Sequence, residues 1–229
     1  MPKTPTASAL IRELKMHGNP QLAAFSTRFF KTGKGQYGYG DKFLGLKVPL
    51  TRRLIRPYQK LPLSEIQKLL NSPFHEARLA GVIILTKQKD VADFYLKNAA
   101  RINNWDLVDV SAPRIVGPLI KTRGTGFLKK LARHPLLWNR RISMLATLHE
   151  TMKGNPDPAL EIAELLLNDK EDLMHKAVGW MLREVGKRCS KSVLDGFLDK
   201  HARHMPRTAL RYALEHYPEA KRAYYMKRT

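Results

Sequence analysis

The sequence has few of the features that would cross-link the chain or anchor it in a membrane. Its 229 residues include a single cysteine, Cys189, which excludes an internal disulfide and any metal cluster held by several thiolates. No apolar run approaches the roughly 20 residues that a membrane span needs. The N-terminal stretch MPKTPTASALIRELK lacks the apolar core of a signal peptide. We therefore expect a cytoplasmic protein, associated with the nucleoid if its source is bacterial.

Acidic residues are also scarce compared with basic ones. The chain has 20 Asp and Glu against 41 Lys and Arg, which gives a formal net charge of +21. A folded protein with this excess is expected to bind a polyanion. The basic residues are spread along the chain, which suits a long groove along a nucleic-acid backbone better than a single basic tail. A basic surface without such a partner is the alternative.

What the sequence does contain is a series of apolar segments with helical spacing, separated by turn signals and without strand-like alternation. Turns are predicted in 32–41, 57–64 and 153–158, which are rich in glycine or proline. A helix is predicted to begin with Ser72 as its N-cap and Pro73 in its first turn. Further helices are predicted within LLWNRRISMLATLHE and EDLMHKAVGWMLREVGK.

Three of these helices share a weak repeat, in which a basic residue is followed by an apolar stretch. The aligned pairs are His75-x-x-Arg78, Trp138-x-x-Arg141 and Leu173-x-x-Lys176. Short helices joined by short turns, with weak self-similarity, predict an all-α helical repeat array (an α-solenoid) with a basic concave face. The length predicts a single domain over residues 1–229. An irregular helical bundle is the alternative.

One predicted helix, within RINNWDLVDVSAPRIVG (101–117), carries two carboxylates in a chain that should attract phosphate. Asp109 lies four residues after Trp105, so it falls at the edge of the apolar stripe that Trp105 begins, whereas Asp106 points elsewhere. An acid beside an indole in such a groove repels phosphate, so a functional role would explain it. The alternative is that Asp106 is a solvated acid of the first turn and that Asp109 pairs with a basic residue of the next repeat.

Several motifs in order resemble a known family. NNWDLVD with SAP behind it, LWNRR, KAVGWMLRE and FLGLKVP are similar to segments of the DNA alkylation repair family of helical-repeat DNA glycosylases, the AlkD type. The similarity extends from about Phe25 to about Tyr217. It implies HEAT-like helix pairs that cradle duplex DNA and hydrolyse the N-glycosidic bond of N3- and N7-alkylated purines, leaving an abasic site.

The resemblance also implies roles for particular residues. Asp109 would be the catalytic carboxylate, Trp105 and Trp180 the aromatic walls around the damaged nucleotide, and Arg141 the active-site cation. Arg140 takes the place of Arg141 if the register is shifted by one residue. The DNA-binding residues that we predict are Arg140, Arg78, Lys176, Arg207, Arg211 and Lys34, the last in the Gly-rich loop 32–41.

Two positions depart from the family pattern. Asn104 stands where some members carry a second tryptophan, and Phe29 stands where some present a tyrosine to DNA. The Gly-rich segment 32–42 is also longer than the corresponding connection in the best-studied members.

The chemistry expected for such a site needs few groups. A purine alkylated at N3 or N7 is already cationic, so it leaves as a neutral base without a general acid, and one carboxylate can suffice. No lysine neighbours Asp109 in sequence, which favours a monofunctional enzyme. No cofactor is implied, and no metal is expected, because His201-x-x-His204 has no third ligand at suitable spacing.

The expected partner is therefore duplex DNA containing alkylated bases, bound by a monomer and with no part for a membrane. A non-catalytic helical-repeat protein that binds damaged or branched nucleic acid is the alternative function.

Overall fold

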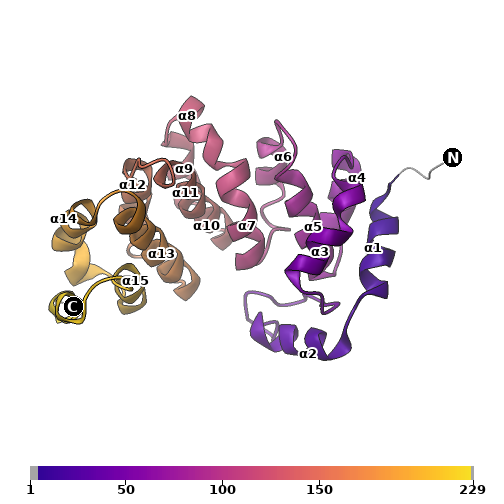
Figure 1. The fold of residues 1–229 in the computed structure, drawn as a ribbon, viewed down its shortest axis with the longest axis horizontal. Coiled ribbons are helices and arrows are strands. Elements are labelled where there is room, and N and C mark those ends of the chain that lie inside the picture. The colour runs from indigo at the N-terminus through magenta and orange to yellow at the C-terminus, as the bar shows by residue number, and fades with distance from the viewer. Residues whose placement is uncertain (1–4, 228–229) are drawn as a thin grey trace. The chain divides into compact units, whose positions relative to one another are not determined.

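The structure, a computed structural model, describes residues 5–227, which form helices joined by turns (Figure 1). The α-helices are α1 (Ala7–Met16), α2 (Pro20–Phe29), α3 (Val48–Leu54), α4 (Leu63–Leu70), α5 (His75–Leu85), α6 (Ala92–Lys97), α7 (Trp105–Ile115), α8 (Ile120–Arg123), α9 (Gly126–Ala132), α10 (Leu137–Ala146), α11 (Leu148–Thr151), α12 (Asp157–Leu166), α13 (Asp172–Arg188), α14 (Lys191–His201), α15 (Arg207–Ala213) and α16 (Glu219–Met226). Short 3-10 helices cover Arg56–Tyr58, Gly117–Leu119 and Ala202–His204. No strand forms within 5–227, so the predicted all-α class is confirmed. None of the described helices is long and apolar enough to cross a membrane.

The chain divides into two compact units, one ending at Ser111 and the other beginning at Ala112. The boundary falls inside α7, which carries Trp105 and Asp109 on the side of the first unit. The helices expected from the three repeat segments are present as α5, α10 and α13. A single domain over residues 1–229 stays a prediction.

In the first unit, α1 packs against α3, α4 and α5. The residues that α1 buries are Ala7, Leu10 and Leu14, which recur at the spacing of one helix face. All eleven residues of α5 are buried, so this helix forms the centre of the unit's core.

The start of α5 differs from the prediction. The helix begins at His75 with Phe74 at the N-cap position, so Ser72 is not its N-cap and Pro73 is not in its first turn. The cause is a backbone bridge, in which the N–H of Lys42 donates to Pro73 O (3.0 Å) and the N–H of His75 donates to Lys42 O (2.8 Å). This pairing keeps Phe74 extended, and the Ser72 hydroxyl instead accepts from the N–H of Phe74 at 3.2 Å.

A buried carboxylate on α5 fixes the segment that contains FLGLKVP. Glu76 accepts hydrogen bonds from three successive backbone N–H groups, those of Leu44 (2.9 Å), Gly45 (2.7 Å) and Leu46 (3.2 Å). Gly45 has φ +80°, and a Cβ there would lie 2.1 Å from Asn19 O, so only glycine fits. The segment thereby presents Phe43 to the first residue of α5, His75.

In the second unit, the 17-residue helix α13 is central, because α10, α12, α14 and α15 all pack against it. Its approach to α15 depends on Gly179, where a Cβ would lie 2.3 Å from Ala209 O. Any larger residue at this position would push the two helices apart.

Candidate functional site

One group of candidate residues lies on α7. Trp105 and Asp109 are one turn apart on this helix, and both are partly exposed. Asn104 is fully buried before the helix, and its Oδ1 accepts from the N–H of Trp105 at 2.9 Å. The residue that replaces the second tryptophan of some family members therefore holds the start of α7.

Trp105 packs against Phe29, the last residue of α2, and against Phe30, which follows it. Its ring stacks on Phe30 with centroids 5.4 Å apart and planes at 24°, and Phe29 meets it edge-on at 6.1 Å. Phe30 in turn stacks on Phe43 at 5.1 Å and 15°. Phe29 is 53% exposed, so its ring and the partly exposed ring of Trp105 form an aromatic surface that solvent reaches.

Beneath these rings lies a buried charged cluster, made of Asp41, His75, Arg78 and Asp106. His75 Nε2 is 2.8 Å from Asp106 Oδ2, and His75 Nδ1 is 3.3 Å from Asp41 Oδ2. The guanidinium of Arg78 pairs with Asp41 Oδ1 at 2.5 Å and also donates to Ser72 O at 2.7 Å. Asn103 donates a further hydrogen bond to Asp41 at 3.1 Å.

The carboxylates of the charged cluster decide the protonation of its histidine. Burial favours the neutral imidazole of His75, but the negative charge of Asp106 and hydrogen bonds to Asp106 and Asp41 outweigh it and raise the pKa to about 9. For Asp41, burial opposes ionisation, yet the hydrogen bond from His75 and the charge of Arg78 lower its pKa below the usual value. At neutral pH the cluster thus contains a buried imidazolium in contact with the rings of Phe30 (5.0 Å) and Phe43 (4.7 Å).

This cluster corrects one interpretation of the sequence. Asp106 is not a solvated acid of the first turn, because its side chain is 14% exposed and bonds the buried His75. The pair ties the first turn of α7, which carries Trp105, to the first residue of α5.

Asp109 lies close enough to Tyr95 to affect that group electrostatically. The Tyr95 hydroxyl is buried and lies 2.8 Å from Ser111 Oγ. Burial raises the pKa of Tyr95 strongly, and the negative charge of Asp109 adds to the rise. The Tyr95 hydroxyl therefore stays protonated, and it lies beside the face of α7 that carries Asp109.

A second group of candidate residues belongs to the second unit and lies on α10 and α13. Arg141 of α10 is 4% exposed, and its Nη1 donates to Leu173 O in the first turn of α13 at 2.6 Å. Trp180 lies seven residues after Leu173, on the same face of α13, and is partly exposed. Its indole N–H donates to Glu184 Oε1 at 3.3 Å, and Glu184 Oε2 accepts from Arg188 at 2.6 Å.

Two of the arginines predicted to bind DNA are engaged inside the fold. Arg78 is 5% exposed and is bound to Asp41 as described. Arg140 holds Asp169 with two hydrogen bonds (2.6 and 3.2 Å) and donates to the carbonyls of His134 and Pro135. Their guanidiniums have structural partners, and contact of Arg78 or Arg140 with DNA stays a prediction.

The other predicted DNA contacts are more accessible. Lys34, Arg207 and Arg211 are exposed, although Arg207 also donates to Met226 O at 2.6 Å. The side chain of Lys176 is 37% exposed and pairs with Asp172 at 2.7 Å, one turn earlier on α13.

Sequence reasoning missed most of the charged cluster and of the aromatic stack. Asp41 and Asp106 are joined through His75 across 34 and 31 residues of sequence, and no spacing rule connects them. The only available signal was that His75 and Arg78 lie one turn apart at the start of a predicted helix.

Comparison with known proteins supplies the family. A sequence model of the family described as DNA alkylation repair enzyme matches residues 10–217. The chain belongs to the DNA alkylation repair enzyme family. Among solved structures it is similar to a "predicted DNA alkylation repair enzyme" from Enterococcus faecalis, with a TM-score of 0.70 and 17% sequence identity over 88% of this chain and 97% of that one. No match was found among curated proteins.

Membership in the DNA alkylation repair enzyme family gives the chain a role in DNA alkylation repair. It indicates an enzyme and DNA as its partner, in agreement with the net charge of +21. The likeness to the Enterococcus faecalis structure supports the helical repeat fold.

Proposed function

We propose that this protein is a monofunctional DNA glycosylase, which hydrolyses the N-glycosidic bond of N3- and N7-alkylated purines in duplex DNA and leaves an abasic site. The observation that carries the proposal is Asp109, a partly exposed carboxylate one turn from the partly exposed Trp105, in a chain of net charge +21. A protein that only binds phosphate gains nothing from an acid on such a surface.

The chemistry requires one carboxylate because the lesion supplies the positive charge. As the bond between C1′ and the purine nitrogen breaks, its electron pair goes to the cationic base, which leaves neutral, and the sugar gains oxocarbenium character. Asp109 stabilises that charge and orients the attacking water, which adds to C1′ and gives up a proton to the Asp109 carboxylate, from which it passes to solvent. No group is needed to protonate the base.

The tryptophans and Arg141 act around this step. We propose that Trp105 and Trp180 place their indole faces against the cationic base or sugar. The indole of Trp105 is positioned by Phe30, and that of Trp180 by Glu184. Arg141 supplies positive charge for the phosphate near the lesion and, through Leu173 O, holds the first turn of the helix that carries Trp180.

Duplex DNA is held mainly by phosphate contacts in this proposal. The exposed or half-exposed cations Lys34, Lys176, Arg207 and Arg211 provide such contacts. The protein acts in the cytoplasm as a monomer and needs neither a cofactor nor a metal, because the lesion carries the charge that drives departure of the base.

The proposal is tested by incubating the protein with duplex DNA that carries 7-methylguanine or 3-methyladenine. We expect free base and abasic sites, whereas uracil and 1,N6-ethenoadenine remain in place because they carry no fixed positive charge. Release of uracil with retention of 7-methylguanine would refute both the mechanism and the assignment of Asp109.

A further inference from the structure

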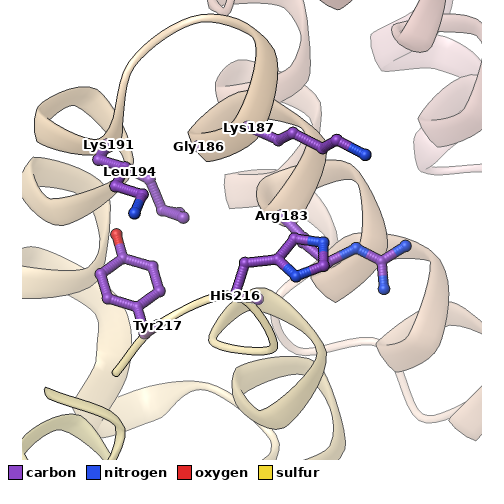
Figure 2. Close-up of a pocket in the computed structure, with 8 residues that line it drawn as sticks. Arg183, Gly186, Lys187, Lys191, Leu194, His216 and Tyr217 are labelled. Atoms are coloured by element: carbon purple, nitrogen blue, oxygen red, sulfur yellow. The ribbon is translucent and has the colours of Figure 1, made fainter. Parts of the chain in front are cut away.

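A second basic site lies in the second unit, in a cavity of about 310 Å³ between α13, α14 and the segment 213–217. Figure 2 shows Lys191, Leu194 and Tyr217 on one side of this cavity and His216, Arg183 and Lys187 on the other. Gly186, Leu194 and Ala213 contribute apolar lining. The proposed excision chemistry uses none of these residues.

The cations around the cavity are only partly neutralised. Arg183 pairs with the exposed Glu215 and lies 3.6 Å from Glu184, which itself pairs with Arg188 at 2.6 Å. Within the described part of the chain, neither Lys187 nor Lys191 forms an ion pair, and both are exposed. The wall therefore keeps an excess of positive charge.

One further observation indicates a ligand, and another concerns the negative charge near the cavity. The Nε of Arg183 is buried and has no hydrogen-bond partner among the described residues, which is a costly state for a donor. The nearby acid Asp195 is already occupied, because it accepts from the Tyr217 hydroxyl (2.7 Å) and from Lys221 (2.5 Å). An anion that enters the cavity thus meets donors and little uncompensated negative charge.

The volume of the cavity and the placement of its donors favour one class of anion over others. A cavity of about 310 Å³ is at the lower end of small-molecule sites, and since each water takes about 30 Å³ it has room for far more than one inorganic phosphate. A backbone phosphodiester has two free oxygens and a chain on either side, which suits an open surface. A terminal phosphomonoester has three free oxygens and one substituent, so donors on different elements can converge on it.

We propose that this cavity binds a terminal phosphomonoester, with Arg183, Lys187 and Lys191 around the phosphate and the attached nucleoside against Leu194 and Ala213. The phosphomonoester belongs either to a free mononucleotide or to the 5′ end of a DNA strand. The site is independent of the proposed excision reaction.

The first test is calorimetric titration of the full chain with adenosine 5′-monophosphate, adenosine and inorganic phosphate at about 0.15 M salt, where unspecific attraction is screened. We expect the monophosphate to bind at least about tenfold more tightly than adenosine, because each charge-assisted hydrogen bond contributes about a factor of ten or more. Equal binding of adenosine and its monophosphate would overturn the proposal.

A double variant, K187Q/K191Q, removes two exposed charges from the cavity wall, and K130Q/K170Q removes two exposed charges elsewhere in the same unit. Binding of the monophosphate should weaken about 100-fold in the first variant and stay within about twofold in the second. Equal effects of the two variants would show that only net charge matters and would overturn the site.

Binding of two short duplexes, one with a 5′-phosphate and one with a 5′-hydroxyl, distinguishes a strand end from a free mononucleotide as the ligand. Tighter binding of the phosphorylated duplex, lost in K187Q/K191Q, identifies a strand end as the ligand. Binding of the mononucleotide without that preference identifies a free nucleotide. Failure of both ligands removes the site but leaves excision of 7-methylguanine untouched, so the two proposals fail separately.

Discussion

The buried imidazolium of His75 should make the stability of this protein depend on pH above neutrality. The pKa of His75 is raised from 6.5 to about 9 in the folded chain, so folding favours the protonated form. The stabilisation is fully present below pH 6.5 and is lost as the pH rises through about 9. At about 1.4 kcal/mol per pKa unit, the loss in the free energy of unfolding is about 3 kcal/mol.

The assay is urea unfolding followed by tryptophan fluorescence at a series of pH values from about 6 to about 9.5. The variant His75→Gln removes the titrating group, and His17→Gln, at an exposed histidine of the same unit, is the matched control. We expect the stability of the wild type and of His17→Gln to fall with pH by about 3 kcal/mol more than that of His75→Gln. At about pH 6 the variant His75→Gln is less stable than the wild type, because the buried Asp41 and Asp106 lose their shared cation.

Identical pH profiles for the wild type and His75→Gln would refute this reasoning. They would mean that His75 is neutral in the folded chain at pH 7 and that the cluster does not hold α7 through charge.

Two further predictions concern DNA binding and the loop 44–46. Affinity for undamaged duplex should fall with salt with a log-log slope of about −0.9 per phosphate contact, and Arg211→Gln should reduce that slope by about one contact; a salt-independent affinity would refute phosphate binding. Glu76→Gln should lower the melting temperature by about 5 to 10 °C, because the neutral amide cannot accept from all three N–H groups of Leu44, Gly45 and Leu46. Glu219→Gln, at an exposed glutamate, should leave the calorimetric melting temperature unchanged.

The helical fold could be predicted from the sequence because it depends on local patterns. Apolar spacing and turn signals correctly placed α5, α10 and α13, and they excluded strands. The error at Ser72 had a non-local cause, since the bridge to Lys42, 33 residues before His75, delays the start of α5. Capping rules consider only neighbouring residues and could not anticipate it.

The candidate site could be predicted only in part. Helical geometry placed Trp105 and Asp109 on neighbouring turns of one helix, and the family resemblance supplied their roles. The partners of Asp106, Arg78 and Arg140 could not be predicted, because they depend on tertiary packing that brings acids and bases together across the chain.

Single-turnover excision of 7-methylguanine by Asp109→Asn, measured together with its melting temperature and its affinity for DNA, tests the central claim most directly. The account predicts an unchanged fold, equal or tighter DNA binding because a negative charge near phosphate is removed, and a rate lowered by several orders of magnitude. A lower melting temperature with nearly normal excision per folded molecule would contradict it and would make Asp109 a structural residue.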